Sequence, residues 1–162
     1  MRVACAYVPG MLHARTRVAL EAYAPGYELY ELGLHFDAYY TLLSTLWEEG
    51  EAWLNVEQDI EIHPTVVAEA ASCPHRLCVW PYHGASQSEV LTGSLGCTRF
   101  SNDLLDEFPD FMRNLPVRGW KILDAEIHPR LLDLGVAPHL HYPTVKHHHV
   151  YGGECACGET HE

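Results

Sequence analysis

The sequence predicts an α/β protein, a single domain in which a largely parallel central sheet is flanked by helices. Two observations support this class. Short segments rich in β-branched and aromatic residues alternate with longer segments that carry apolar residues at helical spacing. One apolar strand, 52–56, runs directly into acidic residues. Ligands of such sheets bind beyond the carboxyl ends of the strands, so this strand also predicts where a site lies.

The first half of the chain alternates strands and helices. Residues 2–8 are apolar and aromatic and predict a strand, and 11–23 predict a helix; a Pro-Gly pair ends each of them. A second strand is expected at 27–32. Residues 37–50 begin at an aspartate suited to an N-cap, place apolar residues on one face and end at a glycine, as a helix does. The strand over 52–56 follows.

The second half continues the alternation with shorter elements. Pro64 suits the first position of a short helix over 65–72. The polar, glycine-containing stretch 83–96 is expected to form an exposed loop or hairpin. The other expected elements are a strand at 77–82, a strand at 97–100, a helix capped by Ser101, a helix within 120–135 and closing strands within 139–150.

Composition limits the function classes. The chain has 162 residues and carries 22 Asp and Glu against 10 Lys and Arg, a net charge of −12 that disfavours a duplex-binding protein. Six dispersed cysteines do not resemble a disulfide scaffold and favour a reducing compartment. No apolar run approaches the ~20 residues of a membrane span, so we expect a soluble, cytoplasmic protein. We expect one domain over 1–150 and a flexible tail with Cys and His over 151–162.

The acidic residues after strand 52–56 are the main candidate site. Glu57, Asp59, Glu61 and His63 occupy alternate positions and project to one side if the strand continues. Gathering buried like charges costs free energy unless a cation or hydrogen-bond donors compensate. The pattern therefore predicts a metal site at the carboxyl end of this strand. The alternative is that these groups splay into water, and we expect Glu61 and His63 to be solvated turn residues.

A resemblance to a known family begins at these residues. An apolar strand that ends in Glu57-Gln58-Asp59 resembles the Asp-x-Asp metal-binding motif of GT-A-fold glycosyltransferases. Inverting members carry, later in the chain, an acidic pair followed by Arg and Gly on a helix, and then a proline-containing strand and a metal-binding His. Similar residues follow here in the same order: Trp120, Asp124, Arg130, Gly135, Pro143 and His147. The similarity covers 2–149.

The chain also departs from the family pattern. Leu123 replaces the acid that usually precedes the catalytic Asp, and Glu57 replaces the first Asp of the motif. Pro129 would delete a hydrogen bond from a helix capped by Asp124, so a helix that starts near Pro129, with Asp124 on a loop, is the alternative. The chain is compact for this fold, which suggests trimmed acceptor-side insertions and a phage- or bacterium-like enzyme.

The resemblance implies a GT-A-like, Rossmann-like sandwich and an inverting, metal-dependent glycosyltransferase. Mn²⁺ or Mg²⁺ would be held by Asp59 and His147, with Glu57 acting on the metal, on a bound water or on a ribose. A hard cation neutralises the diphosphate leaving group of a nucleotide sugar. Asp124 would be the base that takes the proton from the acceptor hydroxyl. A helix N-cap is the structural alternative for Asp124.

The resemblance also implies residues that bind substrates. Val8, Pro9 and Asp37 would bind a UDP- or GDP-sugar together with Glu57 and Asp59. The acceptor hydroxyl is unidentified; a modified nucleobase is one candidate, to which the acidic charge gives no support. The residues assigned to the acceptor are Trp80, Tyr82 and Arg99. Asp37 is equally explained as an N-cap, Trp80 as a core residue and Arg99 as a surface residue. Oligomeric state is not indicated.

Two other functions stay open. One is a non-catalytic zinc or nickel module built on the histidines at 147–149 with Cys155, Cys157 and His161. The other is a metal-dependent hydrolase or nucleotidyltransferase that uses Glu57, Asp59 and Glu61. Cys73 and Cys78 lack a second paired cluster of standard spacing and are expected to be ordinary thiols.

Overall fold

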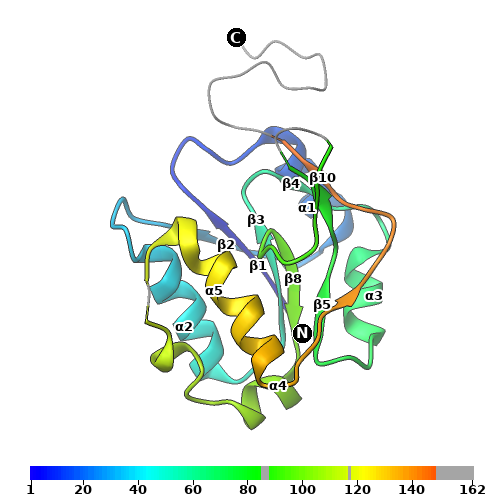
Figure 1. The fold of residues 1–162 in the computed structure, drawn as a ribbon. Coiled ribbons are helices and arrows are strands. Elements are labelled where there is room, and N and C mark those ends of the chain that lie inside the picture. Colours follow the sequence, from blue (N-terminus) through cyan, green and yellow to red (C-terminus); the bar gives the residue numbers. More distant parts are fainter. Residues whose placement is uncertain (85–87, 117, 149–162) are drawn as a thin grey trace.

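A six-stranded sheet in the order β2-β1-β3-β8-β5-β9 forms the centre of the computed structural model, which describes residues 1–84, 88–116 and 118–148 (Figure 1). Five strands run parallel to one another, and β8 runs antiparallel to both of its neighbours, β3 and β5. The predicted, mostly parallel sheet is therefore confirmed. Its strands are β1 (Arg2–Tyr7), β2 (Glu28–Glu31), β3 (Trp53–Glu57), β5 (Leu77–Val79), β8 (Cys97–Phe100) and β9 (His139–Leu140).

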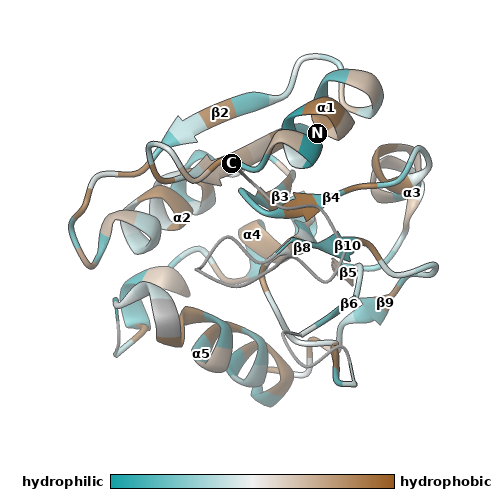
Figure 2. Cartoon of the chain, turned by 90° about the horizontal axis from the view of Figure 1, so that it is seen from above, coloured by the Kyte–Doolittle hydropathy of each residue, from teal (hydrophilic) through white to brown (hydrophobic). Residues whose placement is uncertain are grey.

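Helices cover both faces of the sheet. Helices α2 (Ala38–Glu49) and α5 (Trp120–Asp133) lie on one side, and α1 (Ala14–Tyr23) and α3 (Val66–Ser72) lie on the other (Figure 2). Alternate side chains of β1 enter the two cores, with Ala4 and Ala6 in the first and Val3 and Cys5 in the second. Helix α4 (Asn102–Glu107) and the 3₁₀ helix η1 (Met112–Asn114) complete the first core. The fold is a three-layer sandwich.

The first core is built on aromatic rings. The Trp47 ring on α2 lies 6.0 Å from that of Trp53, 5.6 Å from that of Phe100 and 4.9 Å from that of Phe111, centroid to centroid. Trp53 and Phe100 stack at 4.6 Å. Edge-to-face and offset arrangements of this kind add to the free energy gained by burial of the rings. They attach α2 firmly to the sheet that carries the candidate site.

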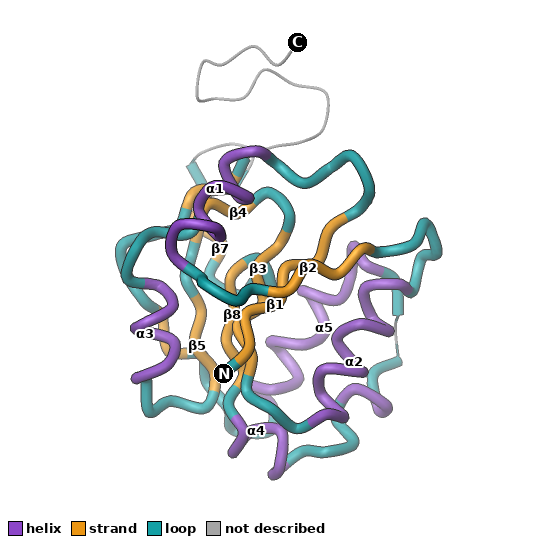
Figure 3. Tube along the Cα trace, turned by 180° about the vertical axis from the view of Figure 1, so that it is seen from behind, coloured by secondary structure: helices purple, strands orange, loops and turns teal. Residues whose placement is uncertain are grey.

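Two small sheets extend the fold beyond the carboxyl ends of the central strands. Strand β4 (Ile60–Glu61) pairs with β10 (Lys146–His147), and β6 (Tyr82–His83) pairs with β7 (Val90–Leu91). Figure 3 shows β4 next to α1, at the end of the sheet where β3 finishes. The expected hairpin within 83–96 is thus present in the described part of that stretch.

One condition, one expectation and one alternative concerning local structure do not hold. The strand does not continue through His63: β3 ends at Glu57, a turn follows, and β4 begins at Ile60. Pro64 precedes its helix and is not its first residue, since α3 begins at Val66 with Thr65 as N-cap. Helix α5 does not begin near Pro129 but runs through it from Trp120.

The helix tolerates Pro129 because of where that residue lies. Proline lacks the N–H that would bond to the carbonyl of residue 125, but Ala125 and Pro129 are both exposed, so water can satisfy that carbonyl. On the opposite face, Leu123, Ile127 and Leu131 are buried in the first core and hold the helix in place. None of the described helices is long and apolar enough to cross a membrane. The expected tail, 151–162, lies outside the described residues.

Buried His128 on α5 should make stability depend on pH. Its side chain is 5% exposed, and neither ring nitrogen has a hydrogen-bond partner among the described residues. Burial lowers the pKa of His128 from 6.5 to about 4. The unfolded chain therefore binds a proton that the folded chain excludes. Stability should fall as the pH drops from about 6.5 towards 4, by about 2–3 kcal/mol at pH 4.5.

Urea unfolding at pH 7 and pH 4.5 tests this prediction. His128→Leu should lose less stability on acidification than the wild type, whereas His35→Gln, which removes an exposed histidine, should lose as much as the wild type. An equal acid-induced loss in the wild type and His128→Leu would show that His128 is not the titrating group.

Candidate active site

The turn after β3 is held by hydrogen bonds from three other segments. Gln58 is 3% exposed, and its Oε1 accepts a hydrogen bond from the Val8 N–H at 2.8 Å. The Gln58 carbonyl accepts from the His13 N–H at 2.9 Å, and the Glu57 N–H donates to the Gly96 carbonyl at 2.9 Å. The end of β1, the start of α1 and the segment before β8 therefore fix the position of the turn.

The C-terminal strand brings a histidine to this turn. Strand β10 pairs antiparallel with β4, with His147 opposite Ile60, and the His148 N–H donates to the Asp59 carbonyl at 2.8 Å. This register places His147 Nε2 3.3 Å from Asp59 Oδ2. The structure therefore brings together two of the residues that the sequence assigned to the metal, from positions 88 residues apart.

Glu61 lies within the same two-stranded sheet and is not a simple solvated residue. Its carboxylate lies 2.8 Å from His148 Nε2 and 3.3 Å from Lys146 Nζ. Although burial raises it, hydrogen bonds from His148 and Lys146 bring the pKa of Glu61 below its ordinary value. The His148 ring in turn stacks on His13 at 4.2 Å. The expectation that Glu61 is a solvated turn residue was wrong, since this carboxylate fastens β10 to β4.

Asp124 approaches the same edge of the sheet from α5. It lies in the interior of the helix, whose N-cap is Gly119, so the N-cap alternative for Asp124 was wrong. Its Oδ1 accepts from the Leu95 N–H at 2.8 Å, and its Oδ2 lies 3.4 Å from Ser94 Oγ. Burial raises the pKa of Asp124, and the hydrogen bonds from Leu95 and Ser94 offset part of that rise.

Glu57 carries the strongest sign of crowded negative charge. Burial, followed by the charges of Asp124 and Asp59, raises the pKa of Glu57 to about 8, although a hydrogen bond from the Tyr39 hydroxyl lowers it. That hydroxyl also accepts from Asn55 Nδ2 at 2.8 Å. The carboxylates of Asp59 on the turn and Asp124 on α5 thus repel a negative charge on Glu57 at the end of β3. A bound cation would relieve this repulsion.

A divalent cation fits the pair formed by Asp59 and His147. Asp59 Oδ1 is buried and has no hydrogen-bond partner among the described residues, while Oδ2 faces His147. Mg²⁺ and Mn²⁺ sites in enzymes use one or two carboxylates and leave other positions to water and substrate phosphates. Glu57 does not join this pair in a tight group of three ligands; the tight group within the described ranges is Cys73, Cys78 and His141. Glu57 therefore suits a role beside the cation.

A cleft of about 600 Å³ opens between α5 and the segment 89–94, and Asp124 lines it. Its walls include the apolar side chains of Val90, Leu91 and Leu132, with Ser94 next to Asp124. None of the predicted acceptor residues, Trp80, Tyr82 and Arg99, lines this cleft. No sequence signal marked it, because the polar stretch 83–96 resembles an ordinary exposed loop.

The predicted donor-binding residues lie in different settings. Val8 is attached to Gln58 at the carboxyl end of β1, and Pro9 is exposed next to it. Asp37 is the N-cap residue of α2, and its side chain makes no capping hydrogen bond. Tyr82, which was predicted to bind the acceptor, is buried; its hydroxyl bonds to Ser94 Oγ, and its ring lies 4.8 Å from that of His147. Tyr82 thus contacts both Ser94 and His147 and helps to hold these two site residues in position.

Two predicted acceptor residues lie away from the cleft. Trp80 is fully buried and stacks on His141 at 4.3 Å, so the core alternative is the one that the structure shows. Arg99 is also buried, and its guanidinium donates to the carbonyls of Cys73 and His75, before the amino end of β5. The alternative that Arg99 is a surface residue was therefore wrong.

Sequence reasoning missed three residues that support the site. Gln58 occupies the variable position of the acidic motif, so its type carried no signal. Tyr39 was treated only as part of an amphipathic helix, and Ser94 only as part of a polar loop. Each acts through a contact with a residue far along the chain: Val8, Glu57 and Asp124, respectively.

No protein-family model matches the sequence, and no curated protein matches it. Solved structures do match the fold. A glycosyltransferase involved in the glycosylation of the major capsid of PBCV-1 aligns over 88% of this chain and 81% of its own, with 14% identity and a TM-score of 0.55. Protein A197 from STIV aligns over 92% and 85%, with 11% identity and a TM-score of 0.57.

A third solved structure is CMP:2-keto-3-deoxy-manno-octonic acid synthetase complexed with CTP. It aligns over 88% of this chain and 89% of its own, with 10% identity and a TM-score of 0.52. At these identities the likeness concerns the fold alone. The chain has the GT-A-like fold that the acidic motif and the order of elements predict.

Gly96 should be required for the packing of Tyr82 beneath the site. A Cβ at this position would lie 2.5 Å from Tyr82 Cε1 and 2.8 Å from its hydroxyl oxygen. Tyr82 is 4% exposed and hydrogen-bonded, so it cannot move aside freely. Gly96→Ala should therefore lower the free energy of unfolding by about 1–3 kcal/mol.

The matched control is Gly93→Ala, in the same segment, where the nearest atom would be His128 Nδ1 at 3.8 Å. Chemical denaturation of both variants measures the difference. Equal stability of the two variants would contradict the packing shown here.

Proposed function

We propose that this protein is a divalent-metal-dependent glycosyltransferase, which transfers a sugar from a nucleotide sugar to an acceptor hydroxyl with inversion. The observation that carries the proposal is the meeting of Asp59, His147, Glu57 and Asp124 at one edge of a GT-A-like sheet. The capsid glycosyltransferase of PBCV-1, which shares the fold, supports the class of reaction. The acceptor class and the choice between UDP- and GDP-sugars are left to experiment.

Asp59 and His147 hold Mn²⁺ or Mg²⁺ in this proposal. When bound, the cation supplies charge neutralisation for the diphosphate leaving group. Val8, Pro9 and Asp37 border the space where the nucleotide binds. Glu57, with its pKa raised to about 8, is protonated at neutral pH before a cation arrives and can donate a hydrogen bond to a sugar or ribose hydroxyl.

Asp124 is the base for the acceptor hydroxyl. The Leu95 N–H and the Ser94 hydroxyl orient its carboxylate at the mouth of the cleft. Burial raises its pKa and so makes it a stronger base than an exposed aspartate. An acceptor that lies in the cleft reaches the donor from the side of α5, opposite the metal pair on the turn. Attack from that side inverts the anomeric carbon.

A second candidate function is nucleotidyl transfer. It is favoured by the similarity to the synthetase that was solved with CTP. In that reaction the attacked atom is the α-phosphorus of a nucleoside triphosphate, and pyrophosphate leaves. Release of pyrophosphate from a triphosphate in the presence of a sugar acid, without cleavage of any nucleotide sugar, would favour this candidate.

Asp59 should be required for metal-dependent nucleotide binding. Nucleoside diphosphates and nucleotide sugars, screened with Mn²⁺, should raise the melting temperature of the wild type because a ligand that binds the folded state stabilises it. Asp59→Asn should lose the Mn²⁺-dependent part of this shift. Asp106→Asn, an exposed aspartate on α4, should keep it. A flat response of the wild type to every nucleotide would make the transferase proposal untenable.

Asp124 should be required for turnover and not for donor binding. With the nucleotide sugar that gives the largest thermal shift, Asp124→Asn should release the nucleoside diphosphate about 10²–10⁴ times more slowly than the wild type, with the thermal shift unchanged. The control is Glu126→Gln on the same helix, which only removes an exposed ion pair with Arg130. Unchanged turnover in Asp124→Asn would remove Asp124 from the role of base.

A further inference from the structure

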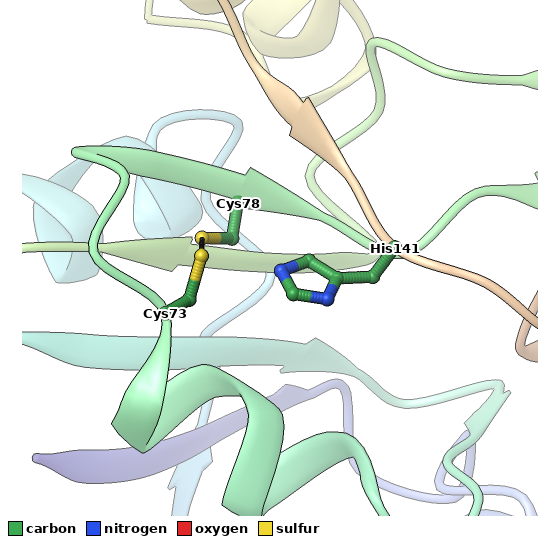
Figure 4. A group of neighbouring side chains, drawn as sticks. All are labelled: Cys73, Cys78 and His141. Carbon is green, nitrogen blue, oxygen red and sulfur yellow. Dashed lines mark hydrogen bonds between the residues drawn. The ribbon is translucent and has the colours of Figure 1, made fainter.

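A second group of metal-ligating side chains lies apart from the acid turn, where α3, β5 and β9 meet. Cys73 follows the last residue of α3, Cys78 lies on β5, and His141 follows β9. One ligand atom from each lies within 4.8 Å of the others (Figure 4). The backbone explains the approach, because His139 pairs with Cys78 and the His141 N–H donates to the Val79 carbonyl at 2.9 Å.

The His141 ring is oriented as a metal ligand is. In Figure 4 its outer nitrogen, Nε2, points toward the two sulfurs. Nε2 is buried and has no hydrogen-bond partner among the described residues. On the other side of the ring, Nδ1 lies 3.7 Å from Glu69 Oε2. Metal-bound histidines commonly have such a carboxylate behind them, which sets the tautomer and the ring orientation.

The surroundings fix both the ring and the carboxylate. The His141 ring stacks on Trp80 at 4.3 Å, and Trp80 Nε1 donates to Glu69 Oε2 at 3.0 Å. The Thr65 hydroxyl donates to the other carboxylate oxygen, Oε1, at 2.5 Å. The imidazole therefore cannot turn away from the sulfurs without losing its stacking contact.

The charges around the group suit a divalent cation. The Arg99 guanidinium approaches Cys78 Sγ at 4.0 Å and donates to the Cys73 carbonyl at 3.3 Å. Two thiolates and Glu69 would carry three negative charges, and Arg99 carries one positive charge. A divalent cation leaves this partly buried group neutral, and a neutral group costs less free energy to shield from water than a charged one.

We infer that Cys73, Cys78 and His141 bind a zinc ion, separately from the candidate active site. Two thiolates and an imidazole are typical zinc ligands, whereas Mg²⁺ and Mn²⁺ prefer oxygen. In a tetrahedral site two zinc-bound sulfurs lie roughly 3.8 Å apart, so the present separation of 3.0 Å requires a small rotation of the cysteine side chains. Three protein ligands leave the fourth position to water or to another ligand.

A disulfide between Cys73 and Cys78 is the competing chemistry. It would join the sulfurs but would leave His141 Nε2 buried without a partner, at a cost in free energy. Zinc satisfies all three side chains at once. It also attaches α3 and β5 to the start of the segment that leads from His141 to β10.

Cobalt substitution tests the inference on the 162-residue chain. After purification under reducing conditions and removal of metal by a chelator, one equivalent of Co²⁺ should give a sulfur-to-cobalt charge-transfer band, and Zn²⁺ should abolish that band. The band should weaken in Cys73→Ser and in Cys78→Ser, each of which leaves one thiolate, and should be lost in the double variant Cys73→Ser/Cys78→Ser. Glu69→Gln, which keeps every ligand, should weaken Zn²⁺ affinity by about 10–100-fold.

The matched control is the double variant Cys155→Ser/Cys157→Ser, which removes the two thiols within 151–162 and should keep the band. A band that is lost in Cys155→Ser/Cys157→Ser, or that survives in Cys73→Ser/Cys78→Ser, would place the metal elsewhere. A wild-type protein that gives no band while both thiols are titratable would overturn the inference outright. Far-UV circular dichroism of each variant separates loss of a ligand from loss of the fold.

Discussion

The hydrogen bonds that hold the turn after β3 are the constraint on which the rest of the site depends. Val8 and His13 donate to Gln58, Glu57 donates to Gly96, and His148 donates to Asp59. These bonds link the turn to residues 8–13, to Gly96 and to His148, which are far from it in sequence. Three of the four bonds join backbone N–H groups to backbone carbonyls and depend only weakly on side-chain identity, whereas the bond from Val8 requires the Gln58 side chain. The turn can therefore hold charged side chains in positions that their own interactions would not favour.

The positions of these charged side chains explain why the pKa of Glu57 is raised at the carboxyl end of β3. Asp124 and Asp59 both oppose the ionisation of Glu57. Among the described residues, the hydrogen-bonding groups that reach the three carboxylates are Leu95 and Ser94 for Asp124, Tyr39 for Glu57 and the His147 ring for Asp59. A purely structural role would be better served by amides or by apolar residues, because uncompensated buried charge destabilises a fold. The cost is understandable if the charge is neutralised by a ligand, and Asp59 Oδ1 is the buried atom left for it. The charges of this chain alone therefore favour a bound cation, without reference to any protein of similar fold.

The sequence was sufficient for features encoded locally and insufficient for those set by long-range packing. The alternation of strands and helices and the acid-ended strand were readable, because periodicity and apolar runs report burial directly. The continuity of α5 through Pro129 could not be predicted from the sequence, since it depends on the exposure of Ala125 and the burial of Leu123. Arg99 was assigned to a surface or a substrate, but its guanidinium lies beside Cys73 and Cys78. The order of Asp59, Asp124 and His147 along the chain indicated a common site. The cleft next to Asp124 could not be predicted, because it depends on where the segment 89–94 lies relative to α5.

The segment 139–148 links the two sites. It begins on β9 against β5, and it passes Pro81, whose carbonyl accepts from the Val145 N–H at 3.0 Å. It ends on β10, where His147 meets Asp59. Only five residues lie between His141 and His147, so a bond between a metal and His141 would shorten the part of this segment that is free to move. The attachment at β5 and the attachment at β4 then act on the same short stretch, and the position of His147 depends on both. The cysteine group, although remote from the carboxylates, would thus help to keep the imidazole at the edge where the proposed chemistry takes place.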